Sequence, residues 1–214
     1  GRVVLVDVGL GDKSSDKFRE IYRVEPEPGL FTSLAALGLA PGDVTDVILT
    51  HLHFDHAGGS TAHTPAGLRP TFPNARWYVQ RRNWENAHAP NPRERASYMP
   101  ENYDALHEAG VLTLWDGACT PWPGVEIVPI DGHTRGQQIV RVAGSRGSAW
   151  YVADLMPTAA HVSIPYVMGY DIAAIETMPE KRAVLERAVA DAQRLVDVRL
   201  RKRTAPREAV EDAA

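Results

Sequence analysis

Three histidines and one aspartate lie within six consecutive positions, and this cluster constrains the chain more than any other feature. Residues 51–59 read His-Leu-His-Phe-Asp-His-Ala-Gly-Gly. Side chains two positions apart on an extended chain point the same way, so His51 and His53 can present imidazoles to one ion. Asp55 and His56 then face a neighbouring position, and imidazole with carboxylate suits zinc or iron. The pattern predicts a site for one metal ion or two adjacent ions.

Apolar runs on both sides of this cluster predict strands mixed with helices. In the first half, residues 3–8, 44–50 and 77–80 have strand character, and residues 31–39 have the apolar spacing of a short helix. In the second half we expect strands over 111–115, 125–130, 138–142 and 149–153, then an amphipathic helix over 176–200. These elements predict an α/β sandwich.

The remaining segments define the expected domain limits. Residues 81–109 are rich in Arg, Glu, Asn and Pro, and we interpret them as irregular helical segments that form an insertion or lid. The tail 201–214 is charged and Ala-rich and is expected to be disordered. We therefore predict one domain over residues 1–200.

Four motifs in this order resemble those of the metallo-β-lactamase-fold hydrolases. The cluster at 51–56 is one of them, and residues 4–9 (Val-Leu-Val-Asp-Val-Gly) resemble the early strand of that family, which ends in an aspartate. Residues 132–134 (Gly-His-Thr) resemble its third motif and residues 151–154 (Tyr-Val-Ala-Asp) its fourth. The resemblance implies a four-layer αββα sandwich with its site at one rim of the sheets.

The resemblance also implies two adjacent metal ions held by six side chains: His51, His53, Asp55, His56, His133 and Asp154. The first ion would take His51, His53 and His133, and the second site would begin at Asp55 and His56. Asp154 would bridge the ions, and Asp55 and Asp154 are the candidate catalytic carboxylates. Asp7 would support the ligand-bearing loops without binding metal, although a turn-capping aspartate is an equal alternative.

One feature of the family pattern is missing from this sequence. The family's last ligand is a histidine on a strand after the C-terminal helix, and no histidine follows His161 here. We expect either an incomplete second site or replacement of that ligand by His161, whose alternative is an exposed loop position. Together with the start at Gly1, this predicts a chain truncated at both ends relative to the family.

Metal-activated hydrolysis is the chemistry that such a site predicts. A water bound between two metal ions ionises near neutral pH and needs no protein base. We expect two zinc ions, with iron or manganese as alternatives. The motif and residues 72–79 look closest to the lactonase and organophosphate-hydrolase branches, which implies a lactone, ester or phosphotriester substrate. The alternatives are a metal-binding but catalytically silent protein and an iron oxidoreductase on the same scaffold.

Candidate pocket residues follow from the same resemblance. A phenol that assists lactone opening in some of these enzymes follows the bridging aspartate closely, but residues 155–157 here are Leu-Met-Pro. Tyr166 and Tyr170, with His161, are therefore the candidate pocket residues. Four further aromatic side chains predict either an apolar pocket or plain packing: Trp84, Tyr98, Tyr103 and Trp122.

Composition excludes several other classes of function. The formal net charge is -4 and the sequence pI is about 6.1, which argues against a nucleic-acid partner. No apolar run approaches the roughly 18 residues of a membrane span, and no signal peptide begins the sequence. We expect a cytoplasmic protein that acts on a small molecule, with a homodimer possible because a truncated sandwich exposes sheet edges.

Overall fold

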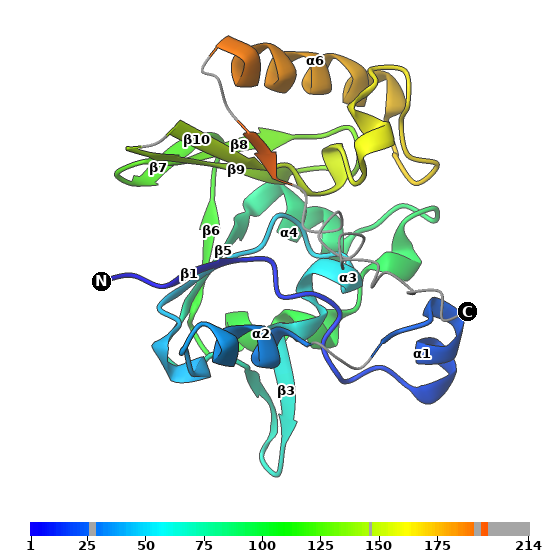
Figure 1. Ribbon diagram of the computed structural model, residues 1–214. Helices are drawn as coiled ribbons and strands as arrows, with labels where there is room; N and C mark the ends of the chain where they lie inside the picture. Colours follow the sequence, from blue (N-terminus) through cyan, green and yellow to red (C-terminus); the bar gives the residue numbers. More distant parts are fainter. Residues whose placement is uncertain (26–28, 146, 191–193, 197–214) are drawn as a thin grey trace, which may run out of the picture.

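Two β-sheets stack face to face and helices cover their outer faces in the computed structural model, which describes residues 1–25, 29–145, 147–190 and the backbone of 194–196 (Figure 1). The first sheet has the order β1-β2-β5-β6, formed by β1 (Val4–Val6), β2 (Asp46–Ile48), β5 (Arg76–Gln80) and β6 (Leu112–Trp115), and all its pairs are parallel. The second has the order β11-β10-β9-β8-β7, formed by β7 (Cys119–Trp122), β8 (Val125–Ile130), β9 (Gln137–Gly144), β10 (Gly147–Tyr151) and β11 (Arg194–Val196). Its pairs are antiparallel except β10 with β11.

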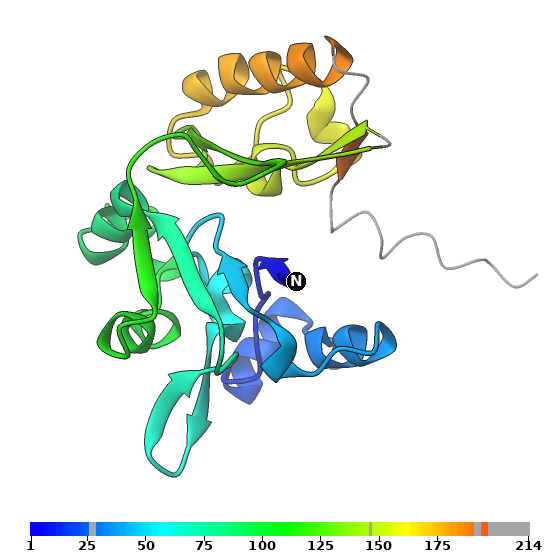
Figure 2. The ribbon, with the colours of Figure 1, turned by 90° about the vertical axis from the view of Figure 1, so that its left-hand side faces the viewer.

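The helices are short except for the last one. They are α1 (Asp16–Tyr22), α2 (Leu30–Ala36), α3 (Phe54–Ala57), α4 (Arg81–His88), α5 (Asp104–Glu108) and α6 (Ala174–Ala190). Single 3-10 turns lie at η1 (Pro41–Asp43), η2 (Gly58–Ser60), η3 (Arg95–Ser97), η4 (Pro100–Asn102), η5 (Ala153–Leu155) and η6 (Ala159–Val162). A hairpin of β3 (Thr61–Thr64) and β4 (Gly67–Pro70) projects away from the layers (Figure 2). Among the described residues, no helix combines the length and the apolar character that a bilayer crossing needs.

Alternation along the strands of the first sheet divides its side chains between two cores. Val47 and Trp77 pack with Leu34 of α2 and Leu106 of α5, on the outer face of the sheet. Their sequence neighbours Ile48 and Tyr78 point the other way, toward the second sheet. Such two-sided burial is typical of a sheet with a layer on each face.

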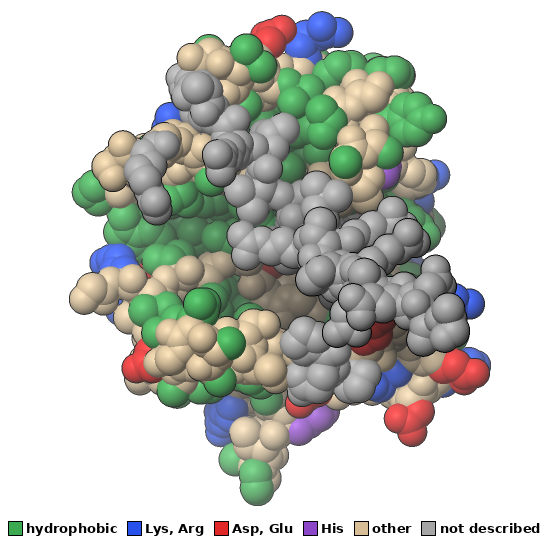
Figure 3. Space-filling model, in the orientation of Figure 1, with side chains coloured by type: hydrophobic (Ala, Val, Ile, Leu, Met, Phe, Trp, Pro, Cys, Tyr) green, Lys and Arg blue, Asp and Glu red, His purple; other side chains and the backbone are tan. Residues whose placement is uncertain are grey.

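The second sheet divides its side chains in the same way. Ile127 and Val140 meet the first sheet, whereas Ile139 and Trp150 pack against α6 on the outside. The order of layers is therefore helix, sheet, sheet, helix, which confirms the predicted αββα sandwich. In the space-filling view, hydrophobic side chains are visible between the two layers on the left-hand side (Figure 3).

The expected strands are present, with shifted ends. β1 stops at Val6 because Asp7 turns the chain with a φ of 58°. The prediction missed α1, the β3–β4 hairpin and β7. It was wrong about the end of the last helix, because α6 ends at Ala190 and β11 pairs with β10 at residues 194–196. The predicted tail 201–214 lies outside the described residues.

The segment 81–109 contains α4 and α5, and it contributes to the main core. Ala87, Tyr103 and Leu106 are buried there in the same cluster as the strands of the first sheet. The interpretation of this segment as a lid stays a prediction.

Candidate metal centre

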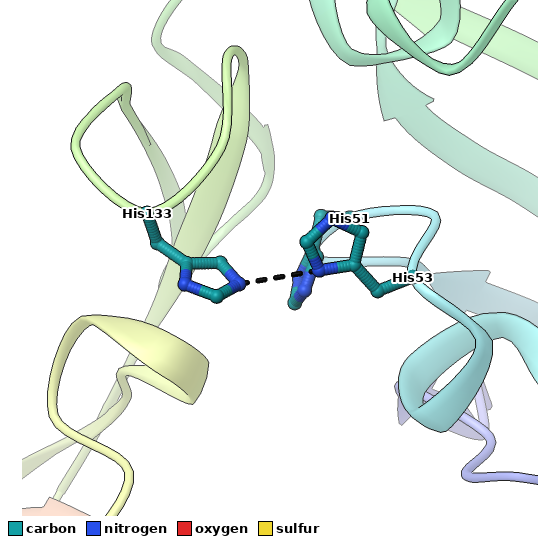
Figure 4. A group of neighbouring side chains, drawn as sticks. All are labelled: His51, His53 and His133. Atoms are coloured by element: carbon teal, nitrogen blue, oxygen red, sulfur yellow. Dashed lines mark hydrogen bonds between the residues drawn. The ribbon is translucent and has the colours of Figure 1, made fainter. Parts of the chain in front are cut away.

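The motif residues lie where strands of the two sheets end at one rim of the sandwich. β2 ends at Ile48, and the chain then passes through His51 and His53 into α3, which carries Asp55 and His56. In the second sheet, β8 ends shortly before His133, and β10 ends shortly before Asp154 in η5. Figure 4 shows His133 pointing from its loop toward His53, with His51 beside it.

Three histidines form the first potential ligand group. One ring nitrogen from each of His51, His53 and His133 lies within 4.8 Å of the others, and all three side chains are buried. The distance from Nε2 of His133 to Nδ1 of His53 is 3.2 Å. Two nitrogens bound to one tetrahedral zinc ion at about 2.0–2.1 Å lie about 3.3 Å apart. The observed spacing fits a shared ion.

The second potential group overlaps the first and contains His51, His56 and Asp154. Oδ1 of Asp154 lies 3.2 Å from Nε2 of His56, and Oδ2 lies 3.5 Å from Nε2 of His133. The carboxylate of Asp154 therefore faces one histidine of each group. Asp55 is at the edge, with Oδ2 3.6 Å from Nε2 of His56 and a side chain that is 38% exposed.

Asp7 decides which nitrogen two of these histidines present. Its Oδ2 lies 2.8 Å from Nδ1 of His56 and accepts the hydroxyl proton of Thr50 at 2.8 Å. Because the Thr50 hydroxyl donates to Asp7, it accepts from Nδ1 of His51 at 3.0 Å. Nε2 of both rings then faces the potential metal groups, as the support of a ligand histidine by a carboxylate requires.

Close contact between two loops explains the glycines that follow the motif. A Cβ atom on Gly58 would lie 2.1 Å from the carbonyl oxygen of Leu10, and one on Gly59 would lie 2.4 Å from that of Val8. The loop that carries Asp7 therefore rests directly on the backbone behind α3. Lys13 connects the same loop to this backbone by donating hydrogen bonds to the carbonyl oxygens of Gly58 and Thr61.

Electrostatics at the site favours a cation. Burial lowers the pKa of His53, which keeps that ring neutral and able to bind metal. Burial acts in the same direction on His56, but the carboxylates of Asp7 and Asp154 outweigh it and raise the pKa of His56 well above its usual value. Without a metal, these carboxylates hold a proton on His56. A divalent ion would take the place of that proton, and the cluster of imidazoles and carboxylates fits such an ion.

Two buried carboxylates near the site carry no motif signal and were missed by the sequence reasoning. Oε2 of Glu94 lies 3.8 Å from Nε2 of His53 and accepts from the Thr134 hydroxyl at 2.7 Å. Oδ1 of Asp171 lies 3.1 Å from Nδ1 of His133. Both residues are about 40 positions from the histidine that they face, so no local spacing could have revealed them.

The candidate pocket residues lie outside both ligand groups of the described chain. Tyr166 is 62% exposed and Tyr170 is 78% exposed. His161 is half-buried on η6, where its Nδ1 lies 2.8 Å from the Thr158 hydroxyl. The structure therefore does not bring His161 into the potential metal groups found among the described residues.

The four further aromatic side chains do not gather around one pocket. Tyr98, Tyr103 and Trp84 belong to the core on the outer face of the first sheet, and Trp122 packs between the sheets. The rings of Tyr98 and His53 meet edge to face, with centroids 4.7 Å apart. Packing, the second of the two predicted roles, accounts for these positions.

A cavity of about 300 Å³ lies beside the motif. Its apolar lining comes from Leu10, Phe18, Phe54 and Met99, and Lys13 and Glu101 contribute charged groups. Phe54 lies between His53 and Asp55 in the motif, so one wall of this cavity belongs to the same turn as the potential ligands.

Residues 1–201 match the family model described as the metallo-beta-lactamase superfamily. A probable metallo-hydrolase of Mycobacterium tuberculosis is 31% identical over 191 residues, covering 78% of this chain and 58% of that protein. An N-acyl homoserine lactonase of Bacillus cereus is 27% identical over 146 residues, covering 63% of this chain and 51% of that protein. The chain thus spans between half and three fifths of the length of these relatives.

Solved structures give the same architecture. A probable metal-dependent hydrolase from Staphylococcus aureus superposes with a TM-score of 0.82 at 30% identity, covering 90% of this chain and 69% of that chain. An N-acyl homoserine lactone hydrolase, with N-hexanoyl-L-homoserine at its catalytic metal centre, superposes with a TM-score of 0.70 at 22% identity. That superposition covers 93% of this chain and 78% of the other, and at this identity it supports the fold alone.

Proposed function

The chain belongs to the metallo-beta-lactamase superfamily, and from that premise we propose that it is a zinc-dependent hydrolase that opens lactone rings. The observation that carries this proposal is the position of Asp154. Its two oxygens lie 3.2 Å from His56 and 3.5 Å from His133, which belong to two overlapping ligand groups. A carboxylate shared in this way suits a pair of adjacent ions.

The residues present fit zinc in both groups. His51, His53 and His133 would hold one ion, and His56, Asp55 and Asp154 would contribute to a second. When bound, zinc supplies a Lewis acid for the substrate carbonyl and lowers the pKa of a water molecule toward neutrality. Asp7 lies behind His56 and Asp171 behind His133, and each carboxylate turns Nε2 of its ring toward the ligand groups.

The remaining catalytic work falls to carboxylates of this chain. Asp154 is buried between two histidines, where it can orient a water molecule by accepting its hydrogen bond. Asp55 is the more exposed of the two carboxylates, so it is placed to exchange a proton with solvent and to return it to the leaving alkoxide. We therefore assign Asp154 to orientation and Asp55 to proton transfer.

The cavity beside the motif has an apolar wall that suits an apolar substituent of the substrate. Phe18, Phe54 and Met99 give it an apolar wall, and its volume of about 300 Å³ accommodates a short acyl chain. Relatives and structural neighbours described as acting on N-acyl homoserine lactones are consistent with a lactone. Aryl esters and phosphotriesters are the remaining substrate classes within the same proposal.

A protein that binds one metal ion without hydrolysis is the second candidate. His51 belongs to both potential ligand groups and one imidazole binds one ion, so a single ion that takes His51 leaves the other group with two of its three members. The two candidates differ in the number of metal ions per chain and in turnover.

Elemental analysis of the purified chain, paired with turnover assays, tests the proposal. We expect two equivalents of zinc and a kcat/KM for an N-acyl homoserine lactone at least 10-fold above that for a matched aryl ester or phosphotriester. One equivalent or none, without turnover of any of the three, would refute the hydrolase. Stoichiometric iron with oxygen consumption would instead indicate an oxidoreductase.

A further inference from the structure

His133 must reach across from the second sheet to meet the histidines of the motif, and its ring is held from behind by one side chain. Oδ1 of Asp171 lies 3.1 Å from Nδ1 of His133, and the two side chains are 1% and 2% exposed. The other oxygen of Asp171 accepts the hydroxyl proton of Thr177 in α6 at 2.9 Å. Both oxygens of this carboxylate are therefore held in fixed directions.

The backbone around Asp171 is paired with the backbone around His133. Ile172 donates its N–H to the carbonyl oxygen of His133 at 3.1 Å, and Ala173 donates to that of Gly132 at 2.9 Å. Gly132 has no room for a side chain, because a Cβ atom there would lie 2.3 Å from the hydroxyl oxygen of Thr177. The two segments thus fix both the backbone and the imidazole of His133.

A buried lysine anchors the segment that precedes Asp171. Lys181 of α6 is fully buried, and its ammonium group donates to the carbonyl oxygens of Ser163 at 2.6 Å and Tyr166 at 2.7 Å. Thr177 and Lys181 lie four positions apart and therefore on the same side of α6. Helix α6 therefore holds this segment at two points. Lys181 contacts its start at Ser163 and Tyr166, and Thr177 contacts Asp171 at its end.

We propose that Asp171 is a positioning residue that makes His133 a metal ligand through Nε2. The proton on Nδ1 is donated to Asp171, so the lone pair of His133 lies on Nε2, which faces Nδ1 of His53 at 3.2 Å and Oδ2 of Asp154 at 3.5 Å. This inference rests on the proposed metal site and adds a residue that lies outside the four sequence motifs.

Zinc affinity measured against a chromogenic chelator tests the inference in the full chain. Carboxylates that orient ligand histidines typically contribute 10- to 100-fold in metal affinity. We expect Asp171→Asn to weaken zinc binding by roughly 10-fold and Asp171→Ala by roughly 100-fold. Glu176→Gln is the matched control, because Glu176 precedes Thr177 in α6 and pairs with Arg135 at the surface. It should bind zinc as the unaltered chain does.

Long-range proton–nitrogen NMR of the imidazole rings provides a readout that a purely structural role of Asp171 would not move. In the metal-free chain we expect His133 to carry its proton on Nδ1, with a downfield proton resonance that indicates a hydrogen bond to a carboxylate. Asp171→Asn should shift this resonance upfield. Thr177→Val, which leaves Asp171 in contact with the ring, should shift it less.

The outcomes separate this inference from the proposed function. Wild-type zinc affinity in a folded Asp171→Asn variant would overturn the positioning role while leaving the hydrolase intact. If that variant does not fold, the unaltered chain decides, because a proton found on Nε2 of His133 contradicts the inference. If the unaltered chain binds no zinc, the proposed function fails and the ligand role of His133 fails with it, and the NMR measurement then decides only whether Asp171 fixes the ring with its proton on Nδ1.

Discussion

The two halves of the sandwich supply the candidate site in different ways. The first half, residues 1–115, places four potential ligands close together after β2 and supports two of them, His51 and His56, through Asp7, which follows β1. The second half, residues 119–196, supplies His133 and Asp154 from two separate loops. Asp171 and Thr177 then hold His133 from positions that belong to no motif.

The contrast follows from the topology of the sheets. In the first sheet, β1 and β2 are parallel neighbours, so Asp7 and the motif both follow strands at the same edge. In the second sheet, β8 and β10 are separated by β9, and the loop after β8, which carries His133, is held by an element outside the sheet. That element is the segment leading into α6. The ligands of the first half therefore depend on local geometry, whereas His133 in the second half depends on packing against the segment before α6.

The largest effect that can test this contrast is expected from the motif itself. His53→Ala removes a proposed ligand and should reduce kcat/KM by more than about 100-fold. Loss of a residue that only orients a ligand costs up to about 100-fold, and loss of the ligand itself should cost more. Zinc content should fall in the same sample. His63→Ala, on the exposed part of β3, is the control. Unchanged turnover in His53→Ala would contradict the assignment of the site.

Asp7→Ala should have the next largest effect, on stability. Four donors would be left around a buried gap, including the backbone N–H of Thr50 at 2.7 Å and the ring of His56 at 2.8 Å. We expect the free energy of unfolding to fall by about 3–5 kcal/mol in urea denaturation, as when a buried charged pair loses one partner. Tyr151→Phe removes the hydroxyl that donates to Asp7 at 3.1 Å, and it should lower the free energy of unfolding by about 1 kcal/mol or less.

Alanine substitutions at Gly58 in the first half and Gly132 in the second test whether close backbone packing matters equally in the two halves. Added Cβ atoms would lie 2.1 Å from Leu10 at Gly58 and 2.3 Å from Thr177 at Gly132. Each alanine variant should lose about 3 kcal/mol of stability, because backbone must move. Gly169→Ala, with nothing within 4 Å of the added atom, should be close to neutral. Full tolerance at Gly132 would show that the second half is less tightly packed than we infer.

Glu180 gives a smaller, pH-dependent test of the second half. Burial raises the pKa of Glu180 above its usual value of 4.5, with further repulsion from Asp131 and Glu176, although its oxygens accept backbone N–H groups of Asp131 and Gly132. A carboxyl group whose pKa is raised on folding contributes stability below pH 4.5 that is lost as pH rises through its folded value. The free energy of unfolding of the metal-free chain in urea should therefore fall as pH rises over that range. In Glu180→Gln this fall should be smaller. An identical pH dependence in both proteins would contradict this effect.

The smallest expected effect concerns backbone strain beside Asp154. Ala153 has a φ of 42°, in the left-handed region that costs a residue with a side chain about 1–2 kcal/mol. Glycine removes that cost, but it loses more conformational entropy on folding than alanine does. The two effects partly cancel, so Ala153→Gly should stabilise the protein by about 0.5 kcal/mol in thermal unfolding. Arg23→Gly, at a φ of 49° at the end of α1, is the comparison in the first half. A loss of stability at Ala153 alone would mean that its methyl group packs usefully.

Prediction from local sequence patterns succeeded for the strands and for the cluster at 51–56, and the family resemblance added the ligand from a distant loop. The pattern at 51–56, the strands that flank it and the order of the four motifs were enough to predict the sandwich, and the structure brings His51, His53 and His133 together. Prediction failed over 194–196, where apolar spacing continued the helical pattern but pairing with β10 produces a strand. Short apolar runs do not distinguish a helix from a strand without their partner.

The sequence by itself determined the mixed α/β class through strand periodicity and the ligand cluster at 51–56 through its spacing, whereas the αββα layers, the ligands His133 and Asp154 and the supporting role of Asp7 followed from the resemblance to a known family. Only the tertiary structure decided which nitrogen each histidine presents, and that Glu94 and Asp171 lie behind His53 and His133. The physical reason is distance along the chain. A carboxylate about 40 residues away contacts an imidazole only after α4, α6 and both sheets have packed, and no local pattern records that contact.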